Sequence, residues 1–310
     1  MGKVKVFLRD VWKNKMFLIM LIPGVVWYIL FSYVPMFGII IAFKDFDYGK
    51  GIFGSDWSGL HNFEFLIKSN DAFTILRNTI CYNVVWIPLG VALAVAMAII
   101  FDALAKKRVT PWTKVTQTMS MMPHFLSWIV ISYFVTGLLD FDKGMVNKLL
   151  VNLGMDKINW YTEPIRWPFI LTIATIWKSV GYNSIVYYST IRGFSPEYYE
   201  AAWLDGANWY KQVRYITLPL LKPTLTVLLT LNIASILSSD FGLFYFIPKN
   251  SGLLYSVTST LDTYVYNGMT QNGDFGMTGA VGFVKSVVGF VLILITNAIV
   301  RKKAPENALF

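Results

Sequence analysis

Cysteine and histidine are scarce in this sequence, and their scarcity excludes several kinds of site. The single cysteine, Cys81, rules out an intrachain disulfide and does not reveal the redox compartment. The two histidines, His61 and His124, do not form a His/Cys set of the kind that holds zinc. We therefore expect no metal site, and we interpret His124 as a hydrogen-bonded residue within an apolar segment.

Sequence motifs for nucleotide binding and catalysis are also absent. No G-x-x-x-x-G-K-S/T phosphate-binding loop occurs, so the chain is not expected to bind and hydrolyse ATP itself. Neither H-E-x-x-H nor G-x-S-x-G is present, so no metalloprotease or serine-hydrolase site is predicted. These absences predict a chain without catalytic residues and without a cofactor of its own.

Charged residues make up only 15% of the sequence, although their formal sum is +9. A basic stripe with interleaved aromatic side chains, which would favour nucleic-acid binding, does not occur. Nucleic acid is therefore not an expected partner. The positive charge must be explained by its position along the chain.

Apolar residues dominate instead. The chain is 55% hydrophobic and 16% aromatic, with a mean hydropathy of +0.51, which is typical of a polytopic membrane protein. Six stretches have the ~20 apolar residues that a helix needs to cross ~30 Å of hydrocarbon. They are Met16–Phe43, Ala72–Phe101, Thr116–Leu139, Trp167–Tyr188, Thr224–Phe246 and Met277–Val300. The sequence thus predicts an all-α membrane protein with six transmembrane helices.

Lys and Arg are distributed unevenly between the two sides of these six stretches. Sixteen lie before the first stretch, in residues 102–115 and 189–223, and after the sixth. The alternate segments hold eight, against eleven acidic residues; they are residues 44–71, 140–166 and 247–276. Because cytoplasmic loops are enriched in Lys and Arg, we predict that both termini are cytoplasmic.

The predicted topology divides the chain into three parts: a cytoplasmic flank (1–15), a six-helix membrane domain (16–300) and a cytoplasmic tail (301–310). Two long outward-facing segments, 44–71 and 140–166, are either a docking surface for a solute-binding protein or simple connecting loops. The sequence alone leaves both interpretations open.

Residues 195–223 form a polar, helix-prone island between the fourth and fifth apolar stretches. Ser195 is placed to cap a helix and Pro196 to occupy its first position. Acidic residues follow in the first turn, where the helix dipole favours negative charge. Ala201 and Ala202 are strong helix formers with small side chains, so the backbone of another protein can approach closely.

The second half of the island predicts a bend. Gly206 weakens the first helix and permits the chain to turn. A second short helix is predicted from Asn208 to Tyr215, ended by Pro219. Two short helices at an angle would make a compact knob.

Part of this island follows the pattern E-A-A-x3-G-x9-I-x-L-P, from Glu200 to Pro219. The pattern resembles the cytoplasmic loop by which membrane subunits of binding-protein-dependent ABC importers dock onto their ATPase. Tyr33–Asp45 and Gly54–Phe63 are similar to the opening of the polysaccharide or complex-oligosaccharide branch of these permeases. The resemblance covers essentially the whole chain, and it implies a type I ABC importer permease fold in the bacterial cell membrane.

The resemblance also implies partners. A second homologous permease subunit would complete the pore, and two ATPase subunits would supply ATP and Mg. An extracytoplasmic solute-binding protein would deliver an oligosaccharide. The residues expected to contact the ATPase are Glu200, Ala201, Ala202, Asp205, Gly206 and Ala207.

Polar residues inside the fourth and fifth stretches are candidates for the substrate path. A charge at the bilayer centre costs about 2.5–3.5 kcal/mol, so Lys178 and Asp240 are expected to face a water-filled path or each other. Sugar hydroxyls need hydrogen-bonding partners, and sugar C–H faces pack on aromatic rings. The candidates are Lys178, Asn183, Tyr187, Asn232, Ser235, Ser239, Asp240 and Phe244. For Asn232 and Ser235, interhelical hydrogen bonding is an equal alternative.

Three glycines recur around the start of the sixth stretch: Gly276 just before it, and Gly279 and Gly282 within it. We interpret this face as a site of close helix packing. Lys285, within the same stretch, is either a residue of the substrate path or a buried ion-pair partner.

Other functions stay open at this stage. A permease for peptides or another polar solute would have the same loop. An ion-coupled secondary carrier would use Asp240, Lys178 and Lys285 as coupling charges, although no inverted repeat is visible. A third alternative, a sugar-transfer enzyme, is supported only by two D-x-D triplets, at Asp45–Asp47 and Asp140–Asp142. Both are predicted on the outer face, where sugar nucleotides are scarce, so we interpret them as chance matches.

Overall fold

The structure is a computed structural model that describes residues 11–107 and 111–309. Its regular structure is helical apart from one two-stranded pairing. The chain divides into two compact units, Met1–Ile67 with Gly268–Val284, and Lys68–Asn267 with Lys285–Phe310. Most of the predicted cytoplasmic flank, residues 1–10, lies outside the described residues.

The first unit begins with a long helical rod. It consists of α2 (Lys15–Tyr28), a π-helical turn (Ile29–Tyr33) and a 3-10 helix (Val34–Phe43). The rod is apolar and long enough to cross a membrane from Lys15 to Phe43, close to the predicted first span. The other elements of this unit are β1 (Lys44–Asp45), α3 (Gly51–Gly54), β2 (Asp56–Trp57), a 3-10 turn (His61–Phe63), the start of α4 (Glu64–Lys68), a π-helical turn (Gly268–Asn272) and the start of α16 (Phe275–Lys303).

Small residues allow close packing within the first unit. A Cβ on Gly279 would lie 3.1 Å from the backbone nitrogen of Ala42, so this glycine permits backbone contact. A Cβ on Gly276 would collide with the amide of Asn62, which donates to the carbonyl oxygens of Ala42 and Lys44 at 3.0 and 2.9 Å. The predicted packing role holds for these two glycines, whereas the space around Gly282 is open.

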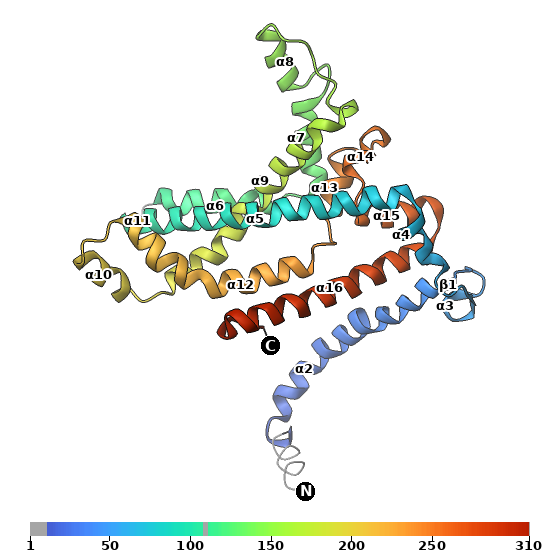
Figure 1. The fold of residues 1–310 in the computed structure, drawn as a ribbon, viewed down its shortest axis with the longest axis horizontal. Coiled ribbons are helices and arrows are strands. Elements are labelled where there is room, and N and C mark those ends of the chain that lie inside the picture. The colour runs from blue at the N-terminus through green and yellow to red at the C-terminus, as the bar shows by residue number, and fades with distance from the viewer. Residues whose placement is uncertain (1–10, 108–110, 310) are drawn as a thin grey trace. The chain divides into compact units, whose positions relative to one another are not determined.

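The second unit holds most of the helices (Figure 1). Those before the island are α5 (Asn70–Lys107), α6 (Pro111–Phe125), α7 (Trp128–Leu139), α8 (Met145–Asn152) and α9 (Trp167–Arg192). Those from the island onwards are α10 (Glu197–Leu204), α11 (Trp209–Gln212), α12 (Leu218–Ala234), α13 (Phe241–Phe246), α14 (Tyr255–Thr258), α15 (Leu261–Asn267) and the rest of α16.

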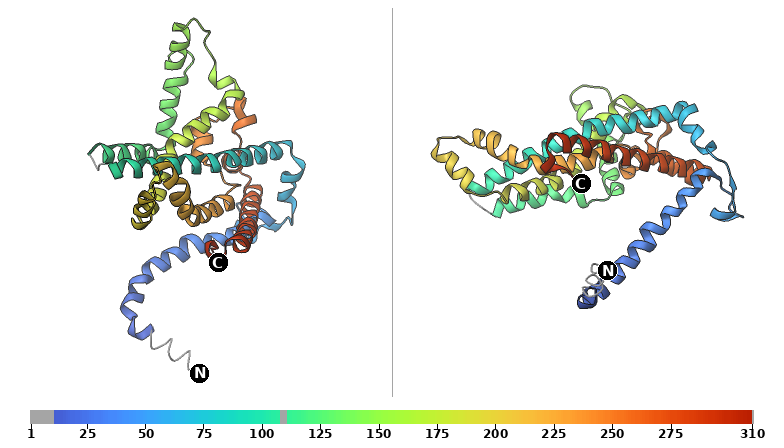
Figure 2. Two further views of the ribbon diagram at one scale, coloured as in Figure 1. Left: turned by 60° about the vertical axis from the view of Figure 1, so that its left-hand side comes forward. Right: turned by 60° about the horizontal axis from the view of Figure 1, so that its bottom comes forward.

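Helices α5, α6 and α9 pack along one another in this unit (Figure 2). The α6–α9 contact depends on Gly181, because a Cβ there would lie 1.8 Å from the carbonyl oxygen of Ser120. Next to it, the rings of His124 and Tyr182 stack with their centroids 4.0 Å apart, which places His124 against an aromatic neighbour.

Two apolar clusters stabilise the second unit, and α5 and α9 contribute to both. One cluster contains Tyr82, Ile131, Trp167, Leu171, Ala174, Leu243, Phe244, Ile247 and Leu254. The other contains Ala94, Val95, Ala98, Val180, Tyr187, Ile191 and Leu221. Burial of such side chains contributes roughly 25 cal/mol per Å² of apolar surface.

The third predicted span, Thr116–Leu139, is not one straight helix. It breaks between α6 and α7, and its two segments, Lys114–Phe125 and Trp128–Leu139, meet at 98°. Ser127 caps α7 by accepting from the backbone nitrogen of Val130 at 3.3 Å. Five helices of the described chain are long and apolar enough to cross a membrane, or six if this bent pair is one span.

The fifth predicted span, Thr224–Phe246, is wrong at both ends. The apolar helix runs from Trp209 to Ala234, and α13 is a separate short helix that begins after Asp240. Pro219 does not end the second helix of the island, because it lies in the first turn of α12. A proline needs no hydrogen-bond acceptor for its nitrogen there, and a π-helical turn at Val213–Thr217 precedes it.

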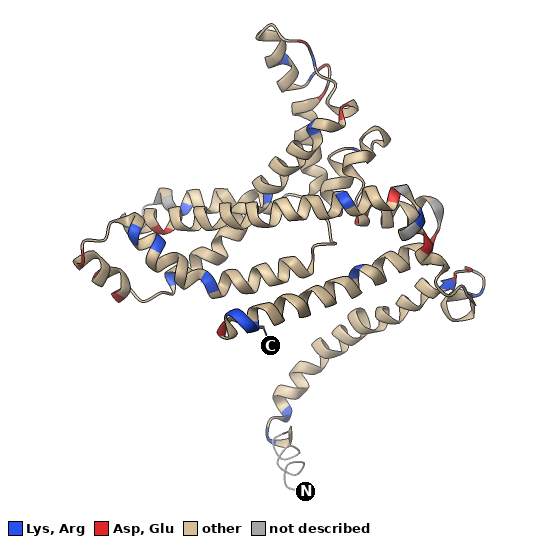
Figure 3. Ribbon diagram, in the orientation of Figure 1, with Lys and Arg blue, Asp and Glu red and all other residues tan. Residues whose placement is uncertain are grey.

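Charges are sparse along the middle of the membrane-length helices and gather near helix ends and connections (Figure 3). Arg301, Lys302 and Lys303 lie in the last turn of α16, where positive charge is favoured by the helix dipole. This distribution is the one expected for helices that cross a bilayer.

We expect Gly181→Ala to destabilise the protein. Its methyl group would force α6 away from α9, and overpacking of this kind costs about 1–3 kcal/mol. Thermal denaturation of the detergent-purified chain, followed by size-exclusion chromatography, measures the change. The matched control is Gly137→Ala on α7, where a Cβ meets nothing within 4 Å. Equal loss of stability in the two variants would contradict this account of the α6–α9 contact.

Candidate functional site

Helix α10 is a short helix with a well-defined beginning and end. The Oγ of Ser195 accepts from the backbone nitrogen of Glu197 at 3.4 Å, close to the predicted cap. At the other end, Gly206 has a φ of +73°. Its nitrogen donates to the carbonyl of Trp203 at 3.0 Å, and the nitrogen of Ala207 donates to that of Ala202 at 2.8 Å. This is a Schellman ending, so Gly206 terminates the helix rather than merely weakening it.

The chain then turns into a second helix that braces the first. Asn208 caps it by accepting from the backbone nitrogen of Lys211 at 2.9 Å. The hydroxyls of Tyr199 and Thr217 lie 3.0 Å apart and connect α10 to the start of α12. We call residues 195–217 the knob; these contacts fix the angle between its two helices.

The knob exposes the residues of the E-A-A pattern. Of the six predicted ATPase contacts, Glu200, Ala201, Asp205 and Gly206 are exposed, and Ala202 and Ala207 are half-buried. Large apolar side chains are exposed beside them, with Trp203 at 72% and Leu204 at 79% of their full accessibility. Exposed apolar side chains gathered in one place are typical of a protein-interaction surface.

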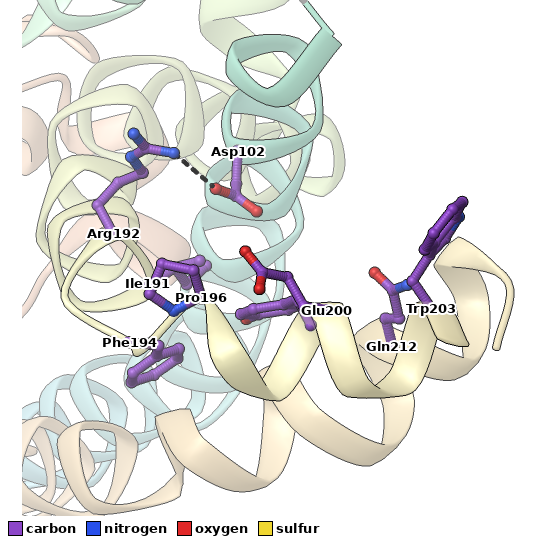
Figure 4. Close-up of a pocket in the computed structure, with 9 residues that line it drawn as sticks. Asp102, Ile191, Arg192, Phe194, Pro196, Glu200, Trp203 and Gln212 are labelled. Atoms are coloured by element: carbon purple, nitrogen blue, oxygen red, sulfur yellow. Dashed lines mark ion pairs between the residues drawn. The ribbon is translucent and has the colours of Figure 1, made fainter. Parts of the chain in front are cut away.

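A cleft of about 470 Å³ lies between the knob and the adjoining ends of α5 and α9 (Figure 4). The carboxylates of Asp102 and Glu200 both point into it, and Arg192 lies 3.8 Å from Asp102. Aromatic side chains of Phe194, Tyr199 and Trp203 also line the cleft. The knob thus borders a partly negative recess that is open to a partner. Asp102 and Arg192 were not predicted, because charges at helix ends seldom stand out in a sequence.

A second cavity, of about 290 Å³, brings together three of the predicted path residues. Asn183 and Tyr187 of α9 and Asn232 of α12 line it, beside Gly90 of α5. The two asparagine side chains are exposed, and Tyr187 forms a buried part of the wall. The cavity therefore offers amide hydrogen-bonding groups next to an aromatic residue.

The other path candidates are placed differently. Ser235 is exposed just after α12. Phe244 is 2% exposed and belongs to an apolar cluster, and it does not line the cavity that Asn183, Tyr187 and Asn232 share. Ser239 donates to Asp262 at 2.9 Å. Its partner was missed because residue 262 was assigned to an outer loop.

The two predicted path charges both have structural partners within the chain. Lys178 donates to backbone carbonyls at the end of α6, and Asp240 caps α13 and accepts from the indole nitrogen of Trp128 at 2.7 Å. Both residues therefore support the backbone where helices break. Lys285 is an ion-pair partner, with its Nζ 2.6 Å from Asp262 Oδ1.

The D-x-D carboxylates are used in turns. Asp47 accepts from the backbone nitrogen of Gly49 at 2.6 Å. Asp140 accepts from the backbone nitrogens of Lys143 and Asp142 at 2.8 and 3.1 Å. The bond from Lys143 is the main reason why the pKa of Asp140 lies below its usual value. These local roles account for Asp47 and Asp140.

Residues 87–305 match the protein family described as "Binding-protein-dependent transport system inner membrane component". The chain is also similar to the polygalacturonan/rhamnogalacturonan transport system permease protein YteP of Bacillus subtilis (strain 168). The two sequences are 33% identical over 295 residues, which cover 95% of this chain and 90% of the relative.

Two solved structures are similar over almost their whole length. One is a bacterial ABC transporter involved in the import of the acidic polysaccharide alginate, with a TM-score of 0.85 and 27% identity, covering 96% of this chain and 99% of that chain. The other is a bacterial alginate ABC transporter in complex with an alginate pentasaccharide-bound periplasmic protein. Its TM-score is 0.83 at 27% identity, with 95% and 96% of the two chains covered.

We expect Gly206→Val to loosen the end of α10. A β-branched residue in the left-handed region is strained by roughly 1–2 kcal/mol, which corresponds to about 5–30-fold faster opening of the helix end. Amide hydrogen exchange at Ala207, whose nitrogen closes the Schellman ending, measures this opening. Gly206→Asn is the control, because asparagine tolerates this conformation. Equal exchange rates in the two variants would show that the ending does not depend on Gly206.

Proposed function

The chain belongs to the family of binding-protein-dependent transport system inner membrane components, and from this premise we propose that it forms half of the pore of an ATP-driven oligosaccharide importer. It is a multi-pass membrane permease subunit and not an enzyme. Its fold is that of the type I ABC importer permeases it resembles.

ATP-driven transport is proposed mainly because the knob exposes a surface suited to an ATPase. It presents Glu200 and small alanines beside exposed Trp203 and Leu204, and its two helices are held at a fixed angle. A surface of this kind suits a protein partner, and ATP and Mg would be bound by that partner, the ATPase. The cleft lined by Asp102 and Glu200 adds a recess suited to a positively charged side chain of the ATPase.

The orientation proposed for the chain follows from its charges. Lys and Arg are concentrated in the segments that include the knob and both termini, which supports a cytoplasmic position for all three. The ATPase would then dock from the cytoplasm. The binding protein would meet the opposite side, which includes residues 44–71 and 140–166.

The proposed cargo is an oligosaccharide. The names of the similar permease and the similar solved structures refer to polygalacturonan, rhamnogalacturonan and alginate. In this chain, the cavity lined by Asn183, Tyr187 and Asn232 offers hydrogen-bonding amides beside a ring, which suits sugar hydroxyls and C–H faces. A second permease subunit would supply the facing wall of the path, and an extracytoplasmic binding protein would deliver the sugar.

Transport requires that the surface bound by the ATPase be coupled to the path taken by the sugar. ATP binding would draw two ATPase subunits together and move the knobs of the two permeases with them. Such coupling needs contacts that differ between the inward-facing and outward-facing states. The braced knob would transmit this movement, because Thr217, which Tyr199 contacts, directly precedes α12.

An ion-coupled carrier is the less favoured alternative. Its proposed coupling charges are engaged in structural contacts, with Lys178 on backbone carbonyls and Lys285 on Asp262. Uptake that needs only an ion gradient, without a co-expressed ATPase, would support the carrier instead.

We expect Glu200→Lys to abolish ATP-driven uptake without affecting membrane insertion. The substitution reverses the charge in the cleft beside the knob, where the ATPase is proposed to dock. Uptake of oligogalacturonides by vesicles with the complete transporter, together with co-purification of the ATPase, measures the effect. Glu197→Lys, one turn earlier on the same helix, is the control and should keep most activity. Normal uptake by the Glu200 variant would contradict the docking role.

We expect Asn232→Leu to raise the KM for sugar uptake. Loss of one hydrogen bond costs about 0.5–1.5 kcal/mol, or roughly 2–10-fold in apparent affinity. The control is Thr226→Val on the same helix, whose hydroxyl donates to the carbonyl of Lys222. Uptake kinetics measured over a range of sugar concentrations distinguish the two. An unchanged KM in the Asn232 variant would remove this residue from the path.

A further inference from the structure

Residues 235–240, between α12 and α13, are non-helical, and several of their backbone groups form hydrogen bonds with side chains of other helices. The amide of Asn83 on α5 donates to the carbonyls of Ile236 and Ser238 at 2.8 and 2.9 Å. Asp262 accepts from the backbone nitrogen and hydroxyl of Ser239 at 2.6 and 2.9 Å. Non-helical backbone at membrane depth needs such internal partners.

The break between α6 and α7 is stabilised in a comparable way. The ammonium of Lys178 on α9 donates to the carbonyl oxygen of His124 at 2.8 Å and to that of Leu126. The carbonyl of Pro123 lies within reach, at 3.4 Å. These carbonyls are at the negative end of the α6 dipole, so a half-buried cation there supplies a donor to acceptors at the helix end.

The two breaks are joined to each other. The indole nitrogen of Trp128, the first residue of α7, donates to Asp240 Oδ2 at 2.7 Å. Asp240 Oδ1 accepts from the nitrogen of Gly242 at 3.1 Å and so caps α13. The ammonium of Lys178 lies 5.1 Å from the centre of the Trp128 ring. We call these four residues the latch.

The contact between α7 and α13 is also very close. A Cβ on Gly242 would lie 2.3 Å from Cδ1 of Trp128 and 3.0 Å from its Cβ. Only glycine fits at this position without displacing the indole. The latch therefore combines a hydrogen bond, a cation over a ring and close packing of the Gly242 backbone against the Trp128 side chain.

The latch connects helices that contribute to one apolar cluster. Ile131 of α7 and Leu243 and Phe244 of α13 belong to the same cluster, together with residues of α5 and α9, whereas Leu221 of α12 belongs to the other. α7 and α13 are thus packed together, and each is joined to its preceding helix by a non-helical break. Breaks of this kind absorb backbone rotation more readily than continuous helix.

We propose that α7 and α13 move as one body during transport, hinged at the two breaks and held together by the latch. Lys178 and Asp240 are then positioning residues of the transport cycle, not contacts of the sugar. The proposal rests on the transport function proposed above, but it concerns a movement within this chain. It predicts that α7 and α13 stay in contact in both nucleotide-free and ATP-bound complexes.

A covalent link tests this directly. In a Cys81→Ser background, Trp128→Cys and Gly242→Cys would start with their Cβ atoms 3.0 Å apart. A small outward shift brings them to the roughly 3.5–4.5 Å that a disulfide requires. The complete complex is oxidised without nucleotide and with ATP and vanadate, and cross-linking is read from gel mobility. Single-cysteine variants are the controls. We expect equally efficient cross-linking in both states, and its loss in either state would overturn the proposal.

Uptake by the same protein gives a second readout. The reduced double variant lacks the Trp128 hydrogen bond, so we expect slow uptake, and oxidation should restore it because the disulfide replaces the latch. Blocked or unchanged uptake after oxidation would overturn the proposal. If the unmodified complex takes up no oligogalacturonide, the proposed cargo fails, whereas the cross-linking result still decides whether α7 and α13 move together.

Two single substitutions of Asp240 test the same contact without relying on the double-cysteine variant, which could misfold. Asp240→Asn keeps an acceptor for Trp128 and for the α13 cap, whereas Asp240→Ala removes both. Hydrogen bonds to a charged group contribute about 1.5–3 kcal/mol, so we expect Ala to slow uptake at least 10-fold more than Asn. Equal loss in the two variants would show that the charge, and not the latch, is what transport needs.

Discussion

A backbone carbonyl inside a membrane-spanning segment has no water to accept from, so a helix can break there only if the protein supplies a donor. In this chain the donor at the end of α6 is the ammonium of Lys178, and the donor for the chain after α12 is the amide of Asn83. These two side chains come from α9 and α5, which are continuous through the second unit. The unbroken helices thus allow their neighbours to bend.

The same continuous helices connect the breaks to the knob. Helix α9 carries Lys178 in its middle, Asn183 and Tyr187 in the cavity, and Arg192 at the cleft beside the knob. The cavity proposed for the sugar therefore lies along the same helix as the surface proposed for the ATPase. In the proposed transport cycle, a movement imposed on the knob would reach the cavity through α9 and through α12, which begins directly after Thr217, the residue that Tyr199 contacts.

The sequence was sufficient for the helical membrane class and for the outline of the knob. Hydropathy located the apolar stretches, and Gly206 predicted where the first helix of the knob changes direction. The sequence did not predict the helix breaks, because the mean hydropathy over about 20 residues is the same for a straight helix and for one bent at Ser127. The partner of Ser239, Asp262, could not be predicted either, because it lies in a segment that was assigned to an outer loop.

The roles of Lys178 and Asp240 show why a residue type alone does not define a site. A charge within an apolar stretch suggests either a path or a structural partner, and only the position of the neighbouring backbone distinguishes them. Here the ammonium meets carbonyls at a helix end, and the carboxylate meets an indole and a helix start. By contrast, Asn183 and Asn232, which the same reasoning selected, do share a cavity.

The most direct test of this account is hydrogen exchange of the reconstituted chain with and without the ATPase subunits. The account predicts slower exchange across residues 197–207 when the ATPase is added, and no change in residues 44–71. Unchanged exchange in the knob, or protection confined to residues 44–71, would contradict it.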